Sequence, residues 1–206
     1  MIATEGSSDA HILKHALDLL RPSIADFFRF IDVSDRHPFP GTGGLLKFAE
    51  GLAKIDVHNQ VVFLFDNDAE GLDIFQRVSS FRLPSNMRAI MLPEIEEFRS
   101  FSARGPEGLA KADINRRAAS IECYLDLEYK APRPAEVIWT NFKKELGVYQ
   151  GALESKEFYL KPFLKLNREK LLERKYNTTK LDAALNALVH ECCDLAATSG
   201  AAEAAA

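Results

Sequence analysis

Three acidic residues of this 206-residue chain follow short apolar runs, where their carboxylates could bind a metal ion. Glu5 follows residues 1–4, and Asp66 and Asp68 follow residues 61–65. In a parallel α/β sheet, ligands bind beyond the carboxyl ends of the strands, so the three carboxylates meet if these runs are neighbouring strands. Clustered carboxylates repel one another unless they are protonated or bridged by a cation, and their hard oxygens favour Mg²⁺ or Mn²⁺. The sequence therefore predicts a divalent-metal site.

Each of these acids also has a simpler interpretation, because an acidic residue after a strand often caps the following helix. The combination is harder to explain in that way. An apolar strand is followed by Asp-x-Asp-x-x-Gly, which ends at Gly71, and a Glu-Gly pair ends the first strand. Haloacid-dehalogenase phosphatases and response-regulator receivers would carry their acids at the first strand, so both classes fit less well.

The elements that would position these acids alternate between strand and helix. Residues 61–65 are continuously apolar and β-prone, which is typical of a central parallel strand covered on both faces. Such alternation predicts an α/β fold with a parallel sheet and right-handed crossovers. Further strands are expected at 1–4, within 27–33 and at 88–92, and helices at about 12–20, 45–52 and 71–78.

The chain changes character after about residue 94. Residues 94–111 lack any period and are expected to form a long loop, followed by helices over 113–127, 137–146, 153–172 and 179–195, with a bend or an end at Pro162. We therefore expect three segments: a catalytic core over residues 1–95, a mainly helical extension over 96–195 that completes the site, and a disordered alanine-rich tail over 196–206.

Residues 37–44 are too rich in proline and glycine for regular structure and predict a loop. This loop lacks the Gly-Lys-Ser/Thr ending of a P-loop, so the turn before a helix is its expected role rather than a phosphate cradle. His11 and His15 have zinc-compatible spacing but no intervening Glu of the His-Glu-x-x-His kind, which favours a surface pair.

The overall composition limits the class of protein. A net charge of −4 argues against a protein that coats nucleic acid by bulk charge, although a carboxylate metal site is compatible with an acidic chain. Three cysteines without Cys-x-x-Cys spacing predict free thiols in a reduced compartment. Neither a signal-peptide pattern nor an apolar run of about 20 residues is present, so we expect a cytoplasmic protein without membrane spans.

The spacing of these acidic residues makes the chain resemble the Toprim domain, the module shared by topoisomerases, bacterial primases, small ribonucleases and OLD-family nucleases. Its pattern is a Glu after the first strand and Asp-x-Asp after a later one, matched here by Glu5 and by Asp66 and Asp68. The resemblance implies a Toprim-like Rossmannoid parallel sheet, a general acid or base at Glu5, and Mg²⁺ held by the Asp pair. In OLD-like nucleases an acid four residues after the Glu joins the metal shell. That position is Asp9 here, where a helix cap is the alternative.

The rest of the chain resembles the helical extension of bacterial Toprim proteins associated with HEPN-type modules and phage defence. Residues 113–125 and 149–156 carry this resemblance. It implies that Asp113 and Glu122 complete a second metal site and that Lys156 contacts the scissile phosphate. A helix N-cap at Asp113 and a solvated lysine at Lys156 are the simpler interpretations.

The resemblance favours a nuclease that uses one or two Mg²⁺ or Mn²⁺ ions and acts on nucleic acid, DNA in preference to RNA. The tyrosines lack the context of a topoisomerase nucleophile, and the length leaves little room for the further modules of a primase. The alternative is a Toprim module that binds nucleic acid or a partner protein without cutting it. Homo-oligomers and a regulatory partner remain open, as does a missing N-terminal region, because the first strand begins at residue 1.

Overall fold

The computed structural model describes residues 1–31, 42–55, 57–131, 133–173 and 176–203, and its centre is a four-stranded parallel sheet. The strand order is β2-β1-β3-β5. These strands are β1 (Ile2–Thr4), β2 (Phe30–Ile31), β3 (Val61–Phe65) and β5 (Met87–Met91). β1 and β3 are neighbours in the sheet, which is the condition on which the predicted acidic site depended.

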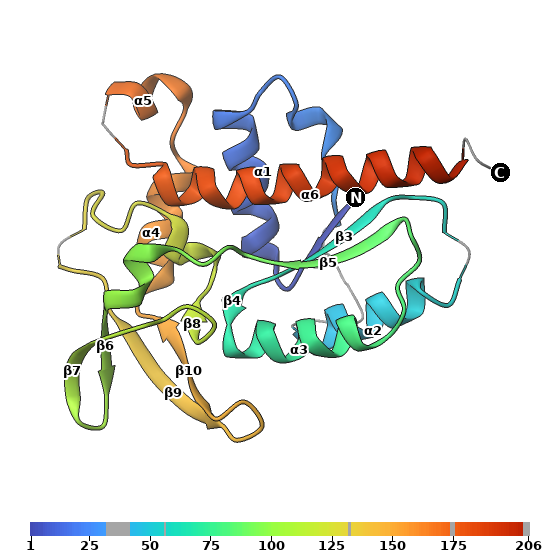
Figure 1. The fold of residues 1–206 in the computed structure, drawn as a ribbon. Coiled ribbons are helices and arrows are strands. Elements are labelled where there is room, and N and C mark those ends of the chain that lie inside the picture. The colour runs from blue at the N-terminus through green and yellow to red at the C-terminus, as the bar shows by residue number, and fades with distance from the viewer. Residues whose placement is uncertain (32–41, 56, 132, 174–175, 204–206) are drawn as a thin grey trace.

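Helices cover both faces of this sheet, so the expected α/β class is confirmed. They are α1 (Ser7–Leu20), α2 (Thr42–Leu52), α3 (Ala69–Ser80) and the long C-terminal α6 (Thr179–Glu203). Because successive side chains of a strand point to opposite faces, Val62 and Leu64 join the core with α1 and α6, whereas Phe63 and Phe65 join the core with α2 and α3. Figure 1 shows these two helix pairs on opposite sides of the sheet.

A second sheet occupies much of the region predicted to be helical. Its strands are β6 (Phe101–Gly105), β7 (Gly108–Ala112), β9 (Val137–Lys143) and β10 (Val148–Leu153), in the order β10-β9-β6-β7. The prediction of a helix over residues 137–146 is therefore wrong. The run Val-Ile-Trp-Thr-Asn-Phe in β9 consists mostly of β-branched and aromatic residues, which favour strands, and Gly147 makes the turn with a positive φ of 67°. The loop expected over 94–111 likewise holds the β6–β7 hairpin, preceded by the 3₁₀ helix η2 (Glu96–Ser100).

The helix expected over 113–127 is also absent. In its place lie β8 (Ala118–Ala119) and the 3₁₀ helix η3 (Ile121–Tyr124). The apolar residues of this stretch mimic a helical period, but Ile114, Ala119, Cys123 and their neighbours are buried on every side of the segment rather than along one helical face. The segment is a buried connector between the two sheets.

The remaining helices agree better with expectation. α4 (Lys156–Leu164) and α5 (Arg168–Glu173) divide the helix expected over 153–172, and Pro162 lies in the last turn of α4. α6 extends to Glu203 and so occupies most of the tail that was expected to be disordered. Residues from both halves of the chain share one hydrophobic core, so the extension packs directly on the parallel sheet.

The 3₁₀ helix η1 (Ala25–Phe27) follows α1. The loop expected over 37–44 lies largely outside the described residues, and α2 begins inside its predicted range. No helix in the described part of the chain is both long enough and apolar enough to cross a membrane.

Candidate metal centre

Glu5 and Asp66 meet at the carboxyl edge of the parallel sheet. Each lies one residue beyond its strand, and the parallel register of β1 and β3 sets Thr4 opposite Leu64. The backbone N–H of Asp66 donates a hydrogen bond of 2.9 Å to Oε1 of Glu5. The two residues predicted from the sequence to share an edge are therefore in direct contact.

Gly71 makes room for this contact at the start of α3. A Cβ atom at this position would lie 2.3 Å from the carbonyl oxygen of Asp66 and 2.9 Å from Oε1 of Glu5. Both distances are far shorter than van der Waals contact. The glycine of the Asp-x-Asp-x-x-Gly motif thus lets the helix approach the turn that carries Asp66.

Asp68 caps α3 and is held from the second sheet. Its Oδ1 accepts the N–H of Gly71 at 2.7 Å, which realises the helix-cap interpretation. Its Oδ2 accepts a hydrogen bond of 2.8 Å from Nε2 of Gln150, which lies on β10. Oε1 of the same Gln150 accepts a hydrogen bond of 2.9 Å from the backbone N–H of Glu70. Gln150 had no predicted role, and no sequence pattern pairs it with a residue 82 positions away.

The buried connector reaches the acids through a short antiparallel pairing. β4 (Asn67–Asp68) pairs with β8, which brings the following residues over Asp66. The N–H of Ile121 donates to Oδ1 of Asp66 at 3.0 Å. Glu122 is 4% exposed, and its Oε2 accepts Ser120 Oγ at 2.8 Å and lies 3.1 Å from Nζ of Lys156. The structure thus gathers Glu122 and Lys156 beside the predicted trio.

Asp9 lies in the first turn of α1, where both of its oxygens have protein partners. Oδ2 accepts the N–H of Gly6 at 2.9 Å, and Oδ1 accepts Ser8 Oγ at 3.2 Å. The side chain therefore caps its helix, as the simpler interpretation predicted. It is nevertheless buried and feels the charge of Glu122, which places it within the acidic cluster.

Asp113 behaves differently from the other predicted ligands. Its Oδ1 accepts the N–H and the Nδ2 of Asn115, at 2.9 and 3.0 Å. These bonds form a local turn, so the carboxylate is engaged with Asn115 rather than with the acids of the cluster. Because the expected helix does not form, Asp113 does not cap one either.

Asn67, between the two aspartates, anchors the site to the second half of the chain. Its side chain is buried, its Oδ1 accepts the N–H of Arg116 at 2.8 Å, and its Nδ2 donates to Oδ1 of Asn115 at 3.0 Å and to the Tyr124 hydroxyl at 3.3 Å. Asn115 in turn exchanges hydrogen bonds with both backbone groups of Ile95. This network was not predicted from the sequence, although an amide residue between two acids after an apolar strand is a usable signal for it.

The acids raise one another's pKa. Burial, followed by the charge of Asp68, raises the pKa of Glu5 well above its usual range. Burial, followed by the charges of Asp9 and Glu5, does the same to the pKa of Asp66, and burial also raises the pKa of Asp68. Burial and Glu122 raise the pKa of Asp9 to about 6. The cluster therefore favours protons or a cation.

Lys156 supplies one positive charge within this cluster. Burial acts to lower its pKa, but the charges of Glu122 and Asp66 outweigh that effect and raise the pKa overall. The ammonium group therefore stays charged. One cation among several carboxylates leaves the site with net negative charge.

The donor set suits a hard divalent ion. Glu5, Asp66 and Glu122 each use one carboxylate oxygen in the contacts above, and within the described residues the second oxygen of each makes no hydrogen bond. Such oxygens are the ligands that Mg²⁺ and Mn²⁺ prefer. Among the described residues, no group of three or more His, Cys, Asp or Glu side chains lies close enough together to hold a metal ion as the side chains stand. Side-chain rotation would be needed to bring such a group together.

Comparisons of the chain with protein-family models, with curated proteins and with solved structures gave no significant match.

Proposed function

We propose that this chain is a divalent-metal-dependent nuclease of the Toprim type, which hydrolyses phosphodiester bonds of DNA in preference to RNA. The observation that carries the proposal is the meeting of Glu5 and Asp66 at the ends of two adjacent parallel strands, with Glu122 brought to them by the buried connector. Bacterial phage defence is the setting that the resemblance implies.

Mg²⁺ or Mn²⁺ would be held by Glu5, Asp66, Asp68 and Glu122, with Asp9 adding negative charge around the ion. The bound metal would polarise a phosphoryl oxygen and lower the pKa of an attacking water. In the metal-free chain the raised pKa of Glu5 favours a protonated carboxyl group, so a bound ion would displace that proton.

The chain's own cation and amides supply the rest of the site. The side chain of Lys156 is 38% exposed beside Glu122, so its ammonium can exchange that partner for a phosphate oxygen. Gln150 and the N–H of Ile121 fix the orientation of Asp68 and Asp66 before a substrate arrives. Such support keeps metal ligands in a productive geometry.

One observation favours the alternative of a binding module that does not cut. Both carboxylate oxygens of Asp9 and of Asp68 are already satisfied by protein donors. Those bonds stabilise the local turns without any metal. A chain with this site could hold nucleic acid or a partner protein while leaving phosphodiester bonds intact.

Incubation with plasmid DNA, single-stranded DNA and RNA in Mg²⁺ or Mn²⁺ separates the two functions. We expect metal-dependent cleavage by the wild type, its loss in Asp66→Ala, and its retention in the matched control Asp18→Ala, which removes an exposed carboxylate from α1. Absence of cleavage of every substrate by the wild type would refute the nuclease. Metal-independent binding that survives Asp66→Ala would then support the binding module.

A further inference from the structure

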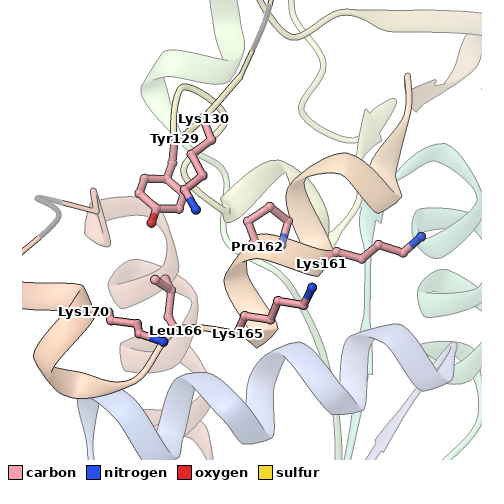
Figure 2. Close-up of a pocket in the computed structure, with 7 residues that line it drawn as sticks. All are labelled: Tyr129, Lys130, Lys161, Pro162, Lys165, Leu166 and Lys170. Atoms are coloured by element: carbon pink, nitrogen blue, oxygen red, sulfur yellow. The ribbon is translucent and has the colours of Figure 1, made fainter.

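Four lysines surround a pocket of about 330 Å³ that the candidate metal centre does not use. They are Lys130, Lys161, Lys165 and Lys170, and Tyr129, Pro162 and Leu166 form the rest of the lining. Figure 2 shows Tyr129 and Lys130 across the hollow from Leu166 and Lys170, with Pro162 at one end. The lining comes from three separate parts of the chain: the loop after η3, α4 with the residues that follow it, and α5.

The charge of this pocket is opposite to that of the whole chain, which carries −4. Lys161 forms an ion pair with Glu157 at 3.6 Å, but both side chains are about 70% exposed, where such a pair contributes little. Figure 2 shows the ammonium group of Lys161 turned away from the hollow, which leaves those of Lys130, Lys165 and Lys170 to repel one another. An anion between them relieves that repulsion. The arrangement therefore favours a ligand with more than one negative charge.

The wall of the pocket adds a fixed aromatic surface. The ring of Tyr129 packs against Tyr176 with centroids 5.1 Å apart, and Nζ of Lys130 lies 5.3 Å from the centroid of the Tyr129 ring. Cations that follow a phosphate backbone beside an aromatic ring are the combination that single-stranded nucleic acid selects. A simple inorganic anion would make no use of the ring or of Leu166.

α4 connects the pocket to the candidate metal centre, because Lys156 is its first residue. Lys161 and Lys165 lie about 7 and 14 Å farther along the axis and, at about 100° per residue, on the opposite side of the helix from Lys156. A strand joining the two sites must bend around α4 over roughly 15 to 20 Å, since the helix is about 10 Å across. That distance corresponds to a few nucleotide steps, because the phosphates of an extended single strand lie farther apart than the rise of about 3.4 Å per strand in a duplex.

We propose that the lysine pocket anchors backbone phosphates of the substrate strand, a few nucleotides from the bond held at Lys156. This inference rests on the proposed function, because it requires a nucleic-acid strand at the candidate metal centre. The pocket gives affinity without reading sequence, since it offers ammonium groups to phosphates. A strand too short to go around α4 can occupy the pocket or the metal centre, but not both.

The test measures binding without catalysis. The long strand, a fluorescein-labelled single-stranded DNA of about 20 nucleotides, is titrated with the chain in EDTA at several salt concentrations, and anisotropy is recorded. The variant is Lys165→Gln with Lys170→Gln, both exposed. The control is Lys47→Gln with Lys54→Gln, which removes the same charge from exposed positions in α2 and just after it.

For the long strand, we expect the pocket variant to reduce the slope of log K against log salt by about 1.4, or about 0.7 for each lost phosphate contact. The control should keep the wild-type slope. An equal loss in the control, or an unchanged slope in the pocket variant, overturns the proposal. Inorganic tripolyphosphate that binds as tightly as the long strand, in a manner dependent on the same lysines, also overturns it in favour of a small-anion site.

Different experimental results would refute the role of the lysine pocket and the proposed nuclease function. Salt-dependent binding that needs Lys165 and Lys170, in a chain without any metal-dependent cleavage, upholds the pocket and refutes the nuclease. Cleavage that needs Asp66 but is unaffected in the pocket variant, with an unchanged salt slope, upholds the nuclease and refutes the pocket.

Discussion

The amide of Gln150 donates a 2.8 Å hydrogen bond to the carboxylate of Asp68, and this bond joins β10 of the second sheet to β4, which directly follows the parallel strand β3. The same amide accepts the N–H of Glu70, so it holds both the acid and the first turn of α3. A bond from a neutral donor to a buried carboxylate stabilises the charged form, and here it opposes the rise that burial imposes on the pKa of Asp68. The second sheet thus adjusts the charge state of the first sheet's edge.

Gln150→Ala should therefore weaken metal binding without unfolding the chain. Removal of the amide raises the pKa of Asp68 further and frees its carboxylate to rotate. We expect a loss of about 10- to 100-fold in Mn²⁺ affinity, as for other residues that orient metal ligands, measured by calorimetric titration. The control is Asn141→Ala, an exposed position on the adjacent β9. Equal affinity in the two variants would show that Gln150 does not orient the site.

Gly71→Ala should destabilise the chain. Its Cβ would overlap the Asp66 carbonyl oxygen, a backbone atom that cannot swing aside, and we expect a loss of about 1 to 3 kcal/mol or more in the free energy of unfolding. Urea denaturation measures this loss. The matched control is Gly51→Ala within α2, where a Cβ meets nothing within 4 Å. That variant should be neutral or more stable by up to about 1 kcal/mol, because alanine is the better helix former. Similar effects at the two glycines would contradict the steric account.

The stability of the metal-free chain should fall as pH rises through the acidic range, because of the cluster. A carboxyl group whose pKa is raised on folding binds more protons in the folded state. Its contribution to the free energy of unfolding therefore decreases as the pH rises above the pKa of the unfolded state. Folding raises the pKa of Asp9 from its ordinary 3.8 to about 6, so the loss occurs between these two pH values. The free energy of unfolding should fall by an amount on the order of 3 kcal/mol across this range. Asp9→Asn keeps an oxygen for the Gly6 N–H and should flatten this part of the curve of unfolding free energy against pH.

Divalent metal should reverse that trend. Mg²⁺ or Mn²⁺ binds the ionised carboxylates, so the increase in melting temperature that it produces should be larger at neutral pH than at about pH 5. Thermal melts with and without metal at the two pH values measure the difference. A metal effect that is the same at both values would mean that the ion binds away from the cluster.

The Glu122–Lys156 pair should show strong coupling. Lys156→Met leaves Glu122 buried beside Ser120 without its cation, and we expect a loss of about 1 to 3 kcal/mol in unfolding free energy and of most nuclease activity. Adding Glu122→Gln should restore most of the stability, since no unpaired charge remains, but none of the activity. Urea denaturation and cleavage assays on the single and double variants form the cycle. Additive losses in stability would exclude the coupling.

The sequence was sufficient for the parts of the site that lie on regular strands. Residues 61–65 could be identified as a central strand because all five side chains are apolar, and that strand fixes where Asp66 emerges. The position of a strand end depends on the local order of residues, which a single sequence contains. The adjacency of β1 and β3, on which Glu5 depends, was only a condition of the predicted site, because strand order is set by tertiary packing; the structure meets that condition.

The second half of the site could not be found in the same way. Residues 113–125 carry apolar side chains at helical intervals because the segment is buried all around, and that pattern hid β8 and η3. The partners of Asp66 and Asp68, the N–H of Ile121 and the amide of Gln150, are set by tertiary packing across 55 and 82 residues. Neither an isoleucine nor a glutamine is a residue type that by itself predicts a hydrogen bond to a metal-site carboxylate.

The bond between Gln150 and Asp68 also determines when the centre can exist during synthesis of the chain. The parallel sheet can pair once β5 has left the ribosome, but Asp68 then lacks its amide donor, and Glu122 lacks Lys156, until about 60 further residues have emerged. Pairings of such long sequence separation form slowly. A nascent chain therefore carries its first acids for seconds before the partners of Asp68 and Glu122 have been synthesised, so the complete cluster forms only late in translation.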